Sequence, residues 1–135
     1  MLDVKALLTK ILLRLSNIGT RYYQTSNNAI SNTSIDNNTV GASVTVPPGT
    51  YLLIAYWPFN TRSSSGTTNS AIRILNSSDT TIAQQRVYAA DSNWNALQCM
   101  TVVTPATTET FRVSGATSRA YTSATMNWIL AVRLA

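Results

Sequence analysis

The chain has 135 residues, which is room for one domain whose core needs no disulfides, together with one short additional element. It contains no histidine, so the most common general base and zinc ligand are both missing. No phosphate-binding glycine loop or Cys/His cluster occurs, and the few carboxylates are far apart in the sequence. We therefore expect no enzymatic activity, no metal site and no cofactor. The carboxylates are Asp3, Asp36, Asp79, Asp91 and Glu109.

The positive charge is dispersed along most of the chain. The net charge is +5, but a basic cluster occurs only in the first 18 residues, and the later arginines are single. Nucleic-acid binding needs clustered Lys and Arg with interleaved aromatic residues, so we do not expect it. No apolar stretch approaches the roughly 18 residues of a membrane span. Cys99 lies in an apolar run, which predicts a buried thiol without an intrachain disulfide.

The first 18 residues have the periodicity of a coiled-coil helix. Apolar residues recur at alternating steps of three and four, with leucine at the a positions and β-branched residues at the d positions. That distribution favours three or four helices over two. We therefore predict an oligomerisation helix over residues 1–18, and its seam consists of Val4, Leu8, Ile11, Leu15 and Ile18.

Two other interpretations of this helix remain open. Additional leucines widen the apolar stripe, which suits packing against the following domain as well as a larger bundle. Lys5, Lys10 and Arg14 fit a helix lying on a membrane surface, although we expect oligomerisation and not membrane contact. We expect no signal peptide, because charged residues interrupt the apolar run and no small-residue cleavage pattern follows it.

The rest of the chain has the pattern of an all-β protein. Residues 19–39 are crowded with turn formers and are predicted to be a connector with one or two short strands. Residues 40–135 are predicted to form an antiparallel β-sandwich, because short strands alternate with turn residues and no helix-length segment interrupts them. The predicted strands are 42–46, 50–57, 70–75, 81–88, 96–104, 109–114 and 125–134.

The strands differ in how many faces they are expected to bury. Residues 51–57 and 128–132 are almost continuously apolar, which predicts that one face meets the core and the other a neighbouring subunit. Residues 70–75 and 109–114 alternate with polar side chains, so we expect an outer sheet with one face in water.

Three segments carry a resemblance to a known class of domains. They are VPPGTYLLIAYWPF with the following AIRIL, LQCMTVVTPATTETFRVSG, and the final WILAVRL. This arrangement resembles the trimeric C-terminal heads of phage or prophage tail-fibre and baseplate receptor-binding proteins, with the jelly-roll topology of C1q and tumour-necrosis-factor domains. The resemblance implies a homotrimer in the virion or outside the cell that recognises bacterial surface saccharide. A short helix in place of a long stalk implies a small stand-alone trimer.

Candidate binding residues come from the predicted loops. An aromatic face beside amide side chains is what the apolar face and the hydroxyls of a sugar ring require. Trp94 has amide neighbours of this kind, although it also suits a role in capping the core at a strand entrance. The alternative function is a purely structural trimeric module without a small ligand. The candidate ligand-binding residues are Arg62, Asn93, Trp94, Asn95, Arg119 and Tyr121.

Overall fold

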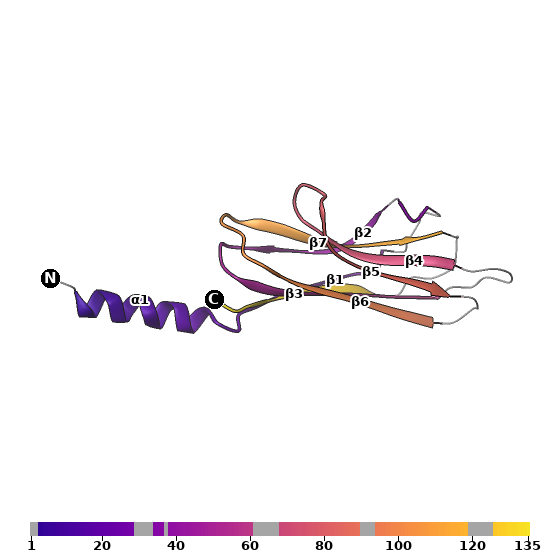
Figure 1. Cartoon of the computed structure of the whole chain (residues 1–135). Coiled ribbons are helices and arrows are strands. Elements are labelled where there is room, and N and C mark those ends of the chain that lie inside the picture. The colour runs from indigo at the N-terminus through magenta and orange to yellow at the C-terminus, as the bar shows by residue number, and fades with distance from the viewer. Residues whose placement is uncertain (1–2, 29–33, 37, 61–67, 90–93, 119–125) are drawn as a thin grey trace.

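The computed structural model describes residues 3–28, 34–36, 38–60, 68–89, 94–118 and 126–135, and for residues 59, 60, 68, 89, 94 and 95 it describes the backbone alone. Within these ranges one helix precedes eight strands (Figure 1). The helix projects from one end of the strand region, next to the C-terminus.

The helix α1 spans Val4–Asn17. It begins at Asp3, whose carboxylate accepts a hydrogen bond from the Ala6 amide at 3.1 Å. It ends at Ile18, which has an extended backbone and is followed by Gly19 at a φ of +82°. Ile18, the last residue of the predicted seam, is the C-cap of α1 and not part of the helix itself.

No residue of α1 is buried in the single chain. The interpretation in which the helix packs against its own domain is therefore wrong. Among the residues described, no helix combines the length and the apolar character that crossing a bilayer requires.

The eight strands form two four-stranded antiparallel sheets that pack face to face (Figure 1). The first sheet has the order β1-β8-β3-β6, and the second sheet has the order β2-β7-β4-β5. This distribution of strands between the sheets is that of a jelly roll, so the predicted all-β sandwich with an N-terminal helix is confirmed. The strands are β1 (Arg21–Ser26), β2 (Thr39–Val46), β3 (Tyr51–Asn60), β4 (Thr68–Leu75), β5 (Thr81–Ala89), β6 (Trp94–Val103), β7 (Glu109–Thr117) and β8 (Asn127–Arg133).

The core lies between the two sheets and follows from strict alternation along the strands. On β3, Leu53 and Trp57 point inward and are fully buried, and they meet Ile72 of β4 and Phe111 of β7 in one cluster. Cys99 of β6 belongs to the same cluster as a free, buried cysteine, as the sequence predicted.

The predicted connector over residues 19–39 contains a strand of the sandwich. β1 pairs with β8 from Arg21 opposite Val132 to Ser26 opposite Asn127. The first sheet therefore begins at Arg21, ahead of the expected domain boundary at Val40. A short strand was expected among the turn-forming Ser, Thr and Asn residues of 19–39, but its membership of the sandwich was not.

The expectation of a wet outer face is wrong for β4. Its outward residue Arg73 is only 5% exposed, because the described residues of the 34–38 segment cover it. The guanidinium donates to Gln84 Oε1, Asn38 Oδ1 and the carbonyl of Ile35, each at 2.7 Å. Burial lowers the pKa of Arg73, and the positive charge of Arg86 acts in the same direction.

Candidate functional site

The outward face of the first sheet is apolar over three of its strands and reaches onto the fourth. Along β3, residues alternate between the core and this face, so Ile54 points outward opposite Leu130 of β8 and Met100 of β6. We call the resulting surface the apolar face. It consists of Tyr23, Leu52, Ile54, Tyr56, Pro58, Met100, Val102, Trp128, Leu130 and Val132.

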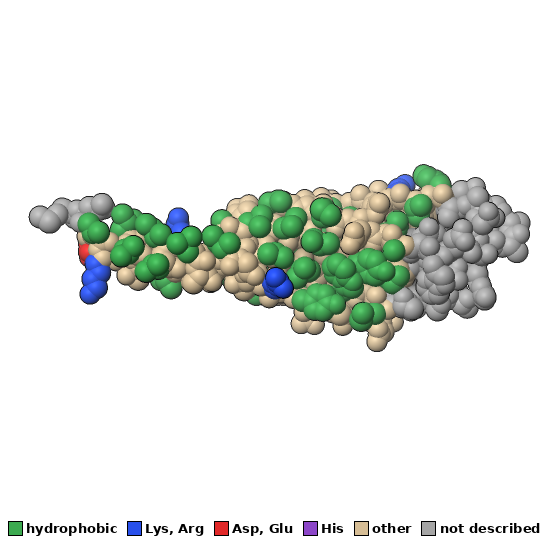
Figure 2. Space-filling view, turned by 90° about the horizontal axis from the view of Figure 1, so that it is seen from below, with side chains coloured by type: hydrophobic (Ala, Val, Ile, Leu, Met, Phe, Trp, Pro, Cys, Tyr) green, Lys and Arg blue, Asp and Glu red, His purple; other side chains and the backbone are tan. Residues whose placement is uncertain are grey.

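Figure 2 shows hydrophobic side chains gathered over this side of the sandwich and continuing along α1. From the strand spacing and the rise per residue, the apolar face extends roughly 20 Å along the strands and 15 Å across them. Met100 and Val102 are 59% and 57% exposed in the single chain. A contiguous exposed apolar surface of this kind is a candidate protein–protein interface.

Aromatic rings give the apolar face a fixed shape. Tyr56 of β3 stacks on Trp128 of β8, with ring centroids 5.3 Å apart and planes at 19°. Tyr23 of β1 approaches the same indole at 6.1 Å and 49°. Because these rings already pack on one another across three strands, the surface is formed before any partner binds.

The helix carries a second uncovered apolar stripe. Val4, Leu8, Ile11 and Leu15 lie on one side of α1, and their side chains are between 44% and 69% exposed. A single helix of 14 residues is only marginally stable in water unless its apolar side is covered. The stripe therefore needs a partner that the single chain does not supply.

The sequence-predicted ligand residues are mostly beyond what the structure describes. Arg62, Asn93, Arg119 and Tyr121 lie outside the described residues, and so do the side chains of Trp94 and Asn95. On the backbone, Trp94 and Asn95 are the first two residues of β6.

The strand ends next to these segments lie at one end of the sandwich. Asn60 pairs with Trp94, and the neighbouring ends of β4 and β7 pair through Ser70 and Thr117. This end is opposite the one from which α1 projects (Figure 1).

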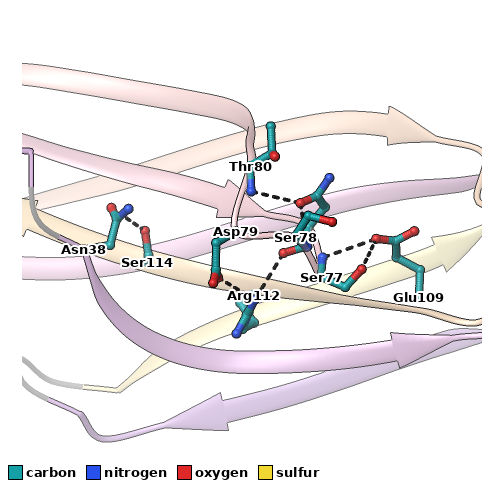
Figure 3. Close-up of polar contacts among 9 residues, drawn as sticks. Asn38, Ser77, Ser78, Asp79, Thr80, Glu109, Arg112 and Ser114 are labelled. Atoms are coloured by element: carbon teal, nitrogen blue, oxygen red, sulfur yellow. Dashed lines mark hydrogen bonds and ion pairs between the residues drawn. The ribbon is translucent and has the colours of Figure 1, made fainter.

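The described carboxylates of the second sheet have structural partners (Figure 3). Arg112 donates to Asp79 at 2.5 Å, which fixes the turn between β4 and β5 against β7. Glu109 accepts hydrogen bonds from the Ser77 hydroxyl at 2.6 Å and from the Ser77 amide at 3.2 Å. These two bonds lower the pKa of Glu109.

The one cysteine does not have the properties of a nucleophile. Burial raises the pKa of Cys99 to about 11, so its thiol stays protonated at neutral pH. Within the described part of the chain, no three Cys, Asp or Glu residues come together in a group suited to a metal ion.

The sequence missed part of the apolar face. It pointed to β3 and β8, but the contributions of Tyr23 on β1 and of Met100 and Val102 on β6 emerge only from the pairing. The signal for β6 was present, because five of the seven residues 97–103 are apolar.

Solved structures of other proteins share the fold of this chain, although sequence comparisons find no relative. No protein-family model matches the chain, and no curated protein matches its sequence. Among solved structures, the globular domain of zebrafish complement 1qA protein superposes with a TM-score of 0.55 and 9% identity, covering 86% of this chain and 96% of that one. Eiger TNF from S. frugiperda matches with a TM-score of 0.44 and 14% identity, covering 87% of this chain and 92% of that one. The chain has a C1q/TNF-like jelly-roll fold.

Proposed function

We propose that the protein is a non-enzymatic homotrimeric binding module, assembled through the apolar face and α1. The observation that carries this proposal is the apolar face itself, which is preformed and uncovered in the single chain. The apolar stripe of α1 supports it, because a helix with no buried residue needs the same kind of partner. Domains with the C1q/TNF-like fold are typically trimeric and without enzymatic activity.

The heptad positions of α1 agree with a parallel trimer. With Leu8 at a and Ile11 at d, Leu7 takes a g position and Leu12 an e position. In a parallel arrangement, a g side chain faces the e side chain five residues further along on the next helix, so Leu7 meets Leu12 of a second copy. Lys5 and Arg14 then have no like-charged partner across the interface, because their opposite positions lie beyond the ends of α1.

Light scattering on the full chain and on a chain starting at Thr20 tests this assembly. We expect the mass of three chains for both, since the apolar face remains when the helix is absent. A full-length trimer that dissociates without the helix would make α1 the assembling element. A monomer in both cases would refute the proposal.

We further propose that the end of the sandwich opposite α1 binds bacterial surface saccharide, as in a phage or prophage tail head located in the virion or outside the cell. The candidate residues are Arg62, Asn93, Trp94, Asn95, Arg119 and Tyr121. One feature supports this proposal: an indole beside amide side chains suits a sugar ring.

A glycan array tests the saccharide proposal. Trp94→Ala is expected to lose the binding signal while the protein keeps its assembled mass, and Tyr88→Ala on the exposed part of β5 serves as the control. An unchanged signal in Trp94→Ala would contradict the proposed site. A folded trimer that binds no glycan at all would favour the purely structural module.

A further inference from the structure

A groove of about 700 Å³ runs between the two sheets on one side of the sandwich. It is lined by Arg21–Ser26 of β1 and Gly41–Thr45 of β2. β1 is the last strand of the first sheet and β2 is the last strand of the second sheet. Edge strands present backbone N–H and C=O groups that have no strand to pair with. The groove is therefore bordered by two strand edges.

One half of this groove is closed by the amide side chains of two asparagines. Asn127, which is fully buried, accepts a hydrogen bond from the Ala42 amide at 2.7 Å. Asn28 donates to the carbonyl of Val40 at 3.1 Å, and its own carbonyl accepts from Asn127 at 3.4 Å. Side-chain amides thus occupy the places that the peptide groups of an added strand would take.

In the other half of the groove, no side-chain amide bridges the two strand edges. No hydrogen bond between described residues joins β1 to Ser43, Val44 or Thr45 across the groove. Arg21 is exposed on the strand edge at this half of the groove, and by strand alternation its side chain lies on the outward side of the first sheet, as that of Tyr23 does. It is also the one charged side chain among the residues that line the groove.

We propose that this open half binds an extended peptide segment of a partner protein as an added strand, with an acidic side chain of the peptide facing Arg21. This site goes beyond the trimer and the saccharide end proposed above. A strand pairs with exposed edges through its backbone, and the pockets beside the edge select its side chains. A segment of about six residues matches the length of β1.

A saccharide fits this groove less well than a peptide does. Tyr22 directs its ring edge-on to Tyr51, with centroids 6.0 Å apart, and it packs against the core. Tyr23 is engaged with Trp128 in the apolar face. Both rings of the groove are therefore already engaged with other aromatic residues, whereas the strand edges have no partner strand.

Fluorescence anisotropy with defined peptides tests the proposal on the full chain. The probe is a labelled peptide, Thr-Val-Glu-Val-Thr-Ser, compared with the same peptide carrying Lys in place of Glu. A third peptide keeps the acidic sequence but is N-methylated at alternate amides, which blocks backbone pairing along one edge. We expect the acidic peptide to bind and the methylated peptide to lose binding.

Charge reversal at Arg21 gives the decisive comparison. Arg21→Glu is expected to weaken binding of the acidic peptide about tenfold and to strengthen binding of the lysine peptide by a similar factor. The control Arg86→Glu, an exposed charge on β5, is expected to change neither affinity. Amide chemical shifts are expected to change along β1 and at Ser43–Thr45.

Four results would overturn the proposal. They are the absence of binding at millimolar peptide, equal binding of the methylated peptide, equal effects of the two charge reversals, and shift changes confined to the apolar face or the opposite end. The backbone amides of the open half could also be protected from hydrogen exchange in the assembled protein without any added peptide. That result would assign the groove to a second copy of the chain and would contradict the proposal.

Discussion

The outward faces of the two sheets differ in what covers them. On the second sheet, the chain covers β4 with its own 34–38 segment, and Arg73 fastens that segment with three hydrogen bonds. On the first sheet, Met100 and Val102 remain more than half exposed, and no described segment lies over them. One sandwich therefore contains a face that is covered by a segment of the same chain and a face that no described segment covers.

The difference reflects the different properties of polar and apolar contacts. The hydrogen bonds of Arg73 require exact placement of Asn38 and Gln84, so they hold one particular segment in one position. Contacts of the apolar face do not depend on direction in this way. The free energy gained by burying that face is proportional to the apolar area removed from water. The apolar face therefore suits assembly between copies, where a large surface has to be buried.

The largest expected effect is the loss of assembly when a charge enters the apolar face. Ile54→Glu places a carboxylate in the middle row of the face, where burial in a trimer costs several kcal/mol for each subunit. Light scattering is expected to report a monomer with the circular dichroism of a folded sandwich. The matched control is Tyr88→Glu, an exposed position on the second sheet, which should keep the assembled mass. Equal assembled masses for Ile54→Glu and Tyr88→Glu would contradict the proposed difference between the two faces.

A large loss of stability is expected where the two sheets meet at β2. A Cβ on Gly41 would lie within 3 Å of Asn127 and of Trp57 Cζ3, and both of these side chains are fully buried. Gly41→Ala should therefore cost about 3 kcal/mol in the free energy of unfolding through overpacking. Urea denaturation measures this cost, with Gly19→Ala as a comparison because its Cβ would meet no atom within 4 Å, although its positive φ adds some strain. A loss of less than 1 kcal/mol at Gly41 would contradict the close packing of Asn127.

A smaller loss is expected when the covering of the second sheet is released. Arg73→Met keeps an apolar stem but leaves the carbonyl of Ile35 and the side chain of Gln84 without their donor. We expect a loss of about 2 kcal/mol in urea denaturation and no change in assembled mass. Arg86→Met, at an exposed position on β5, should leave both quantities unchanged. A change in mass for Arg73→Met would mean that the two faces are coupled.

Strand alternation made most of the fold predictable from the sequence. Phe111 and Val113 alternate with polar residues between turn formers, which locates this strand and its inward face without knowledge of the pairing. The sequence predicted one or two short strands in residues 19–39, but not that β1 pairs with β8, because this pairing joins segments more than 100 residues apart. Nor did it predict that Arg73 is buried, because its three acceptors come from two other segments of the chain.

The candidate site was predictable only in part for the same reason. Continuous apolar runs identified β3 and β8 as strands with two faces to cover, but the order of strands that joins them to Met100 of β6 and Tyr23 of β1 follows from long-range pairing. The groove between β1 and β2 has no sequence signal at all. It arises because β1 and β2 are the edge strands of the two sheets and both edges lie on the same side of the sandwich.

The smallest expected effect is a loss of stability at acid pH. It arises at Glu109 on the second sheet and should leave assembly through the apolar face unchanged. Hydrogen bonds from Ser77 lower the pKa of Glu109 in the folded chain, so the carboxylate adds stability above its unfolded pKa and loses it as the pH falls through the folded value. Unfolding measured from about pH 5 to pH 3 should show this loss, and both Glu109→Gln and Ser77→Ala should flatten it. The apolar face contains no carboxylate, so the assembled mass of the folded protein should stay constant over the same range. A mass that falls together with stability in wild type but not in Glu109→Gln would show that acid acts on assembly through the second sheet.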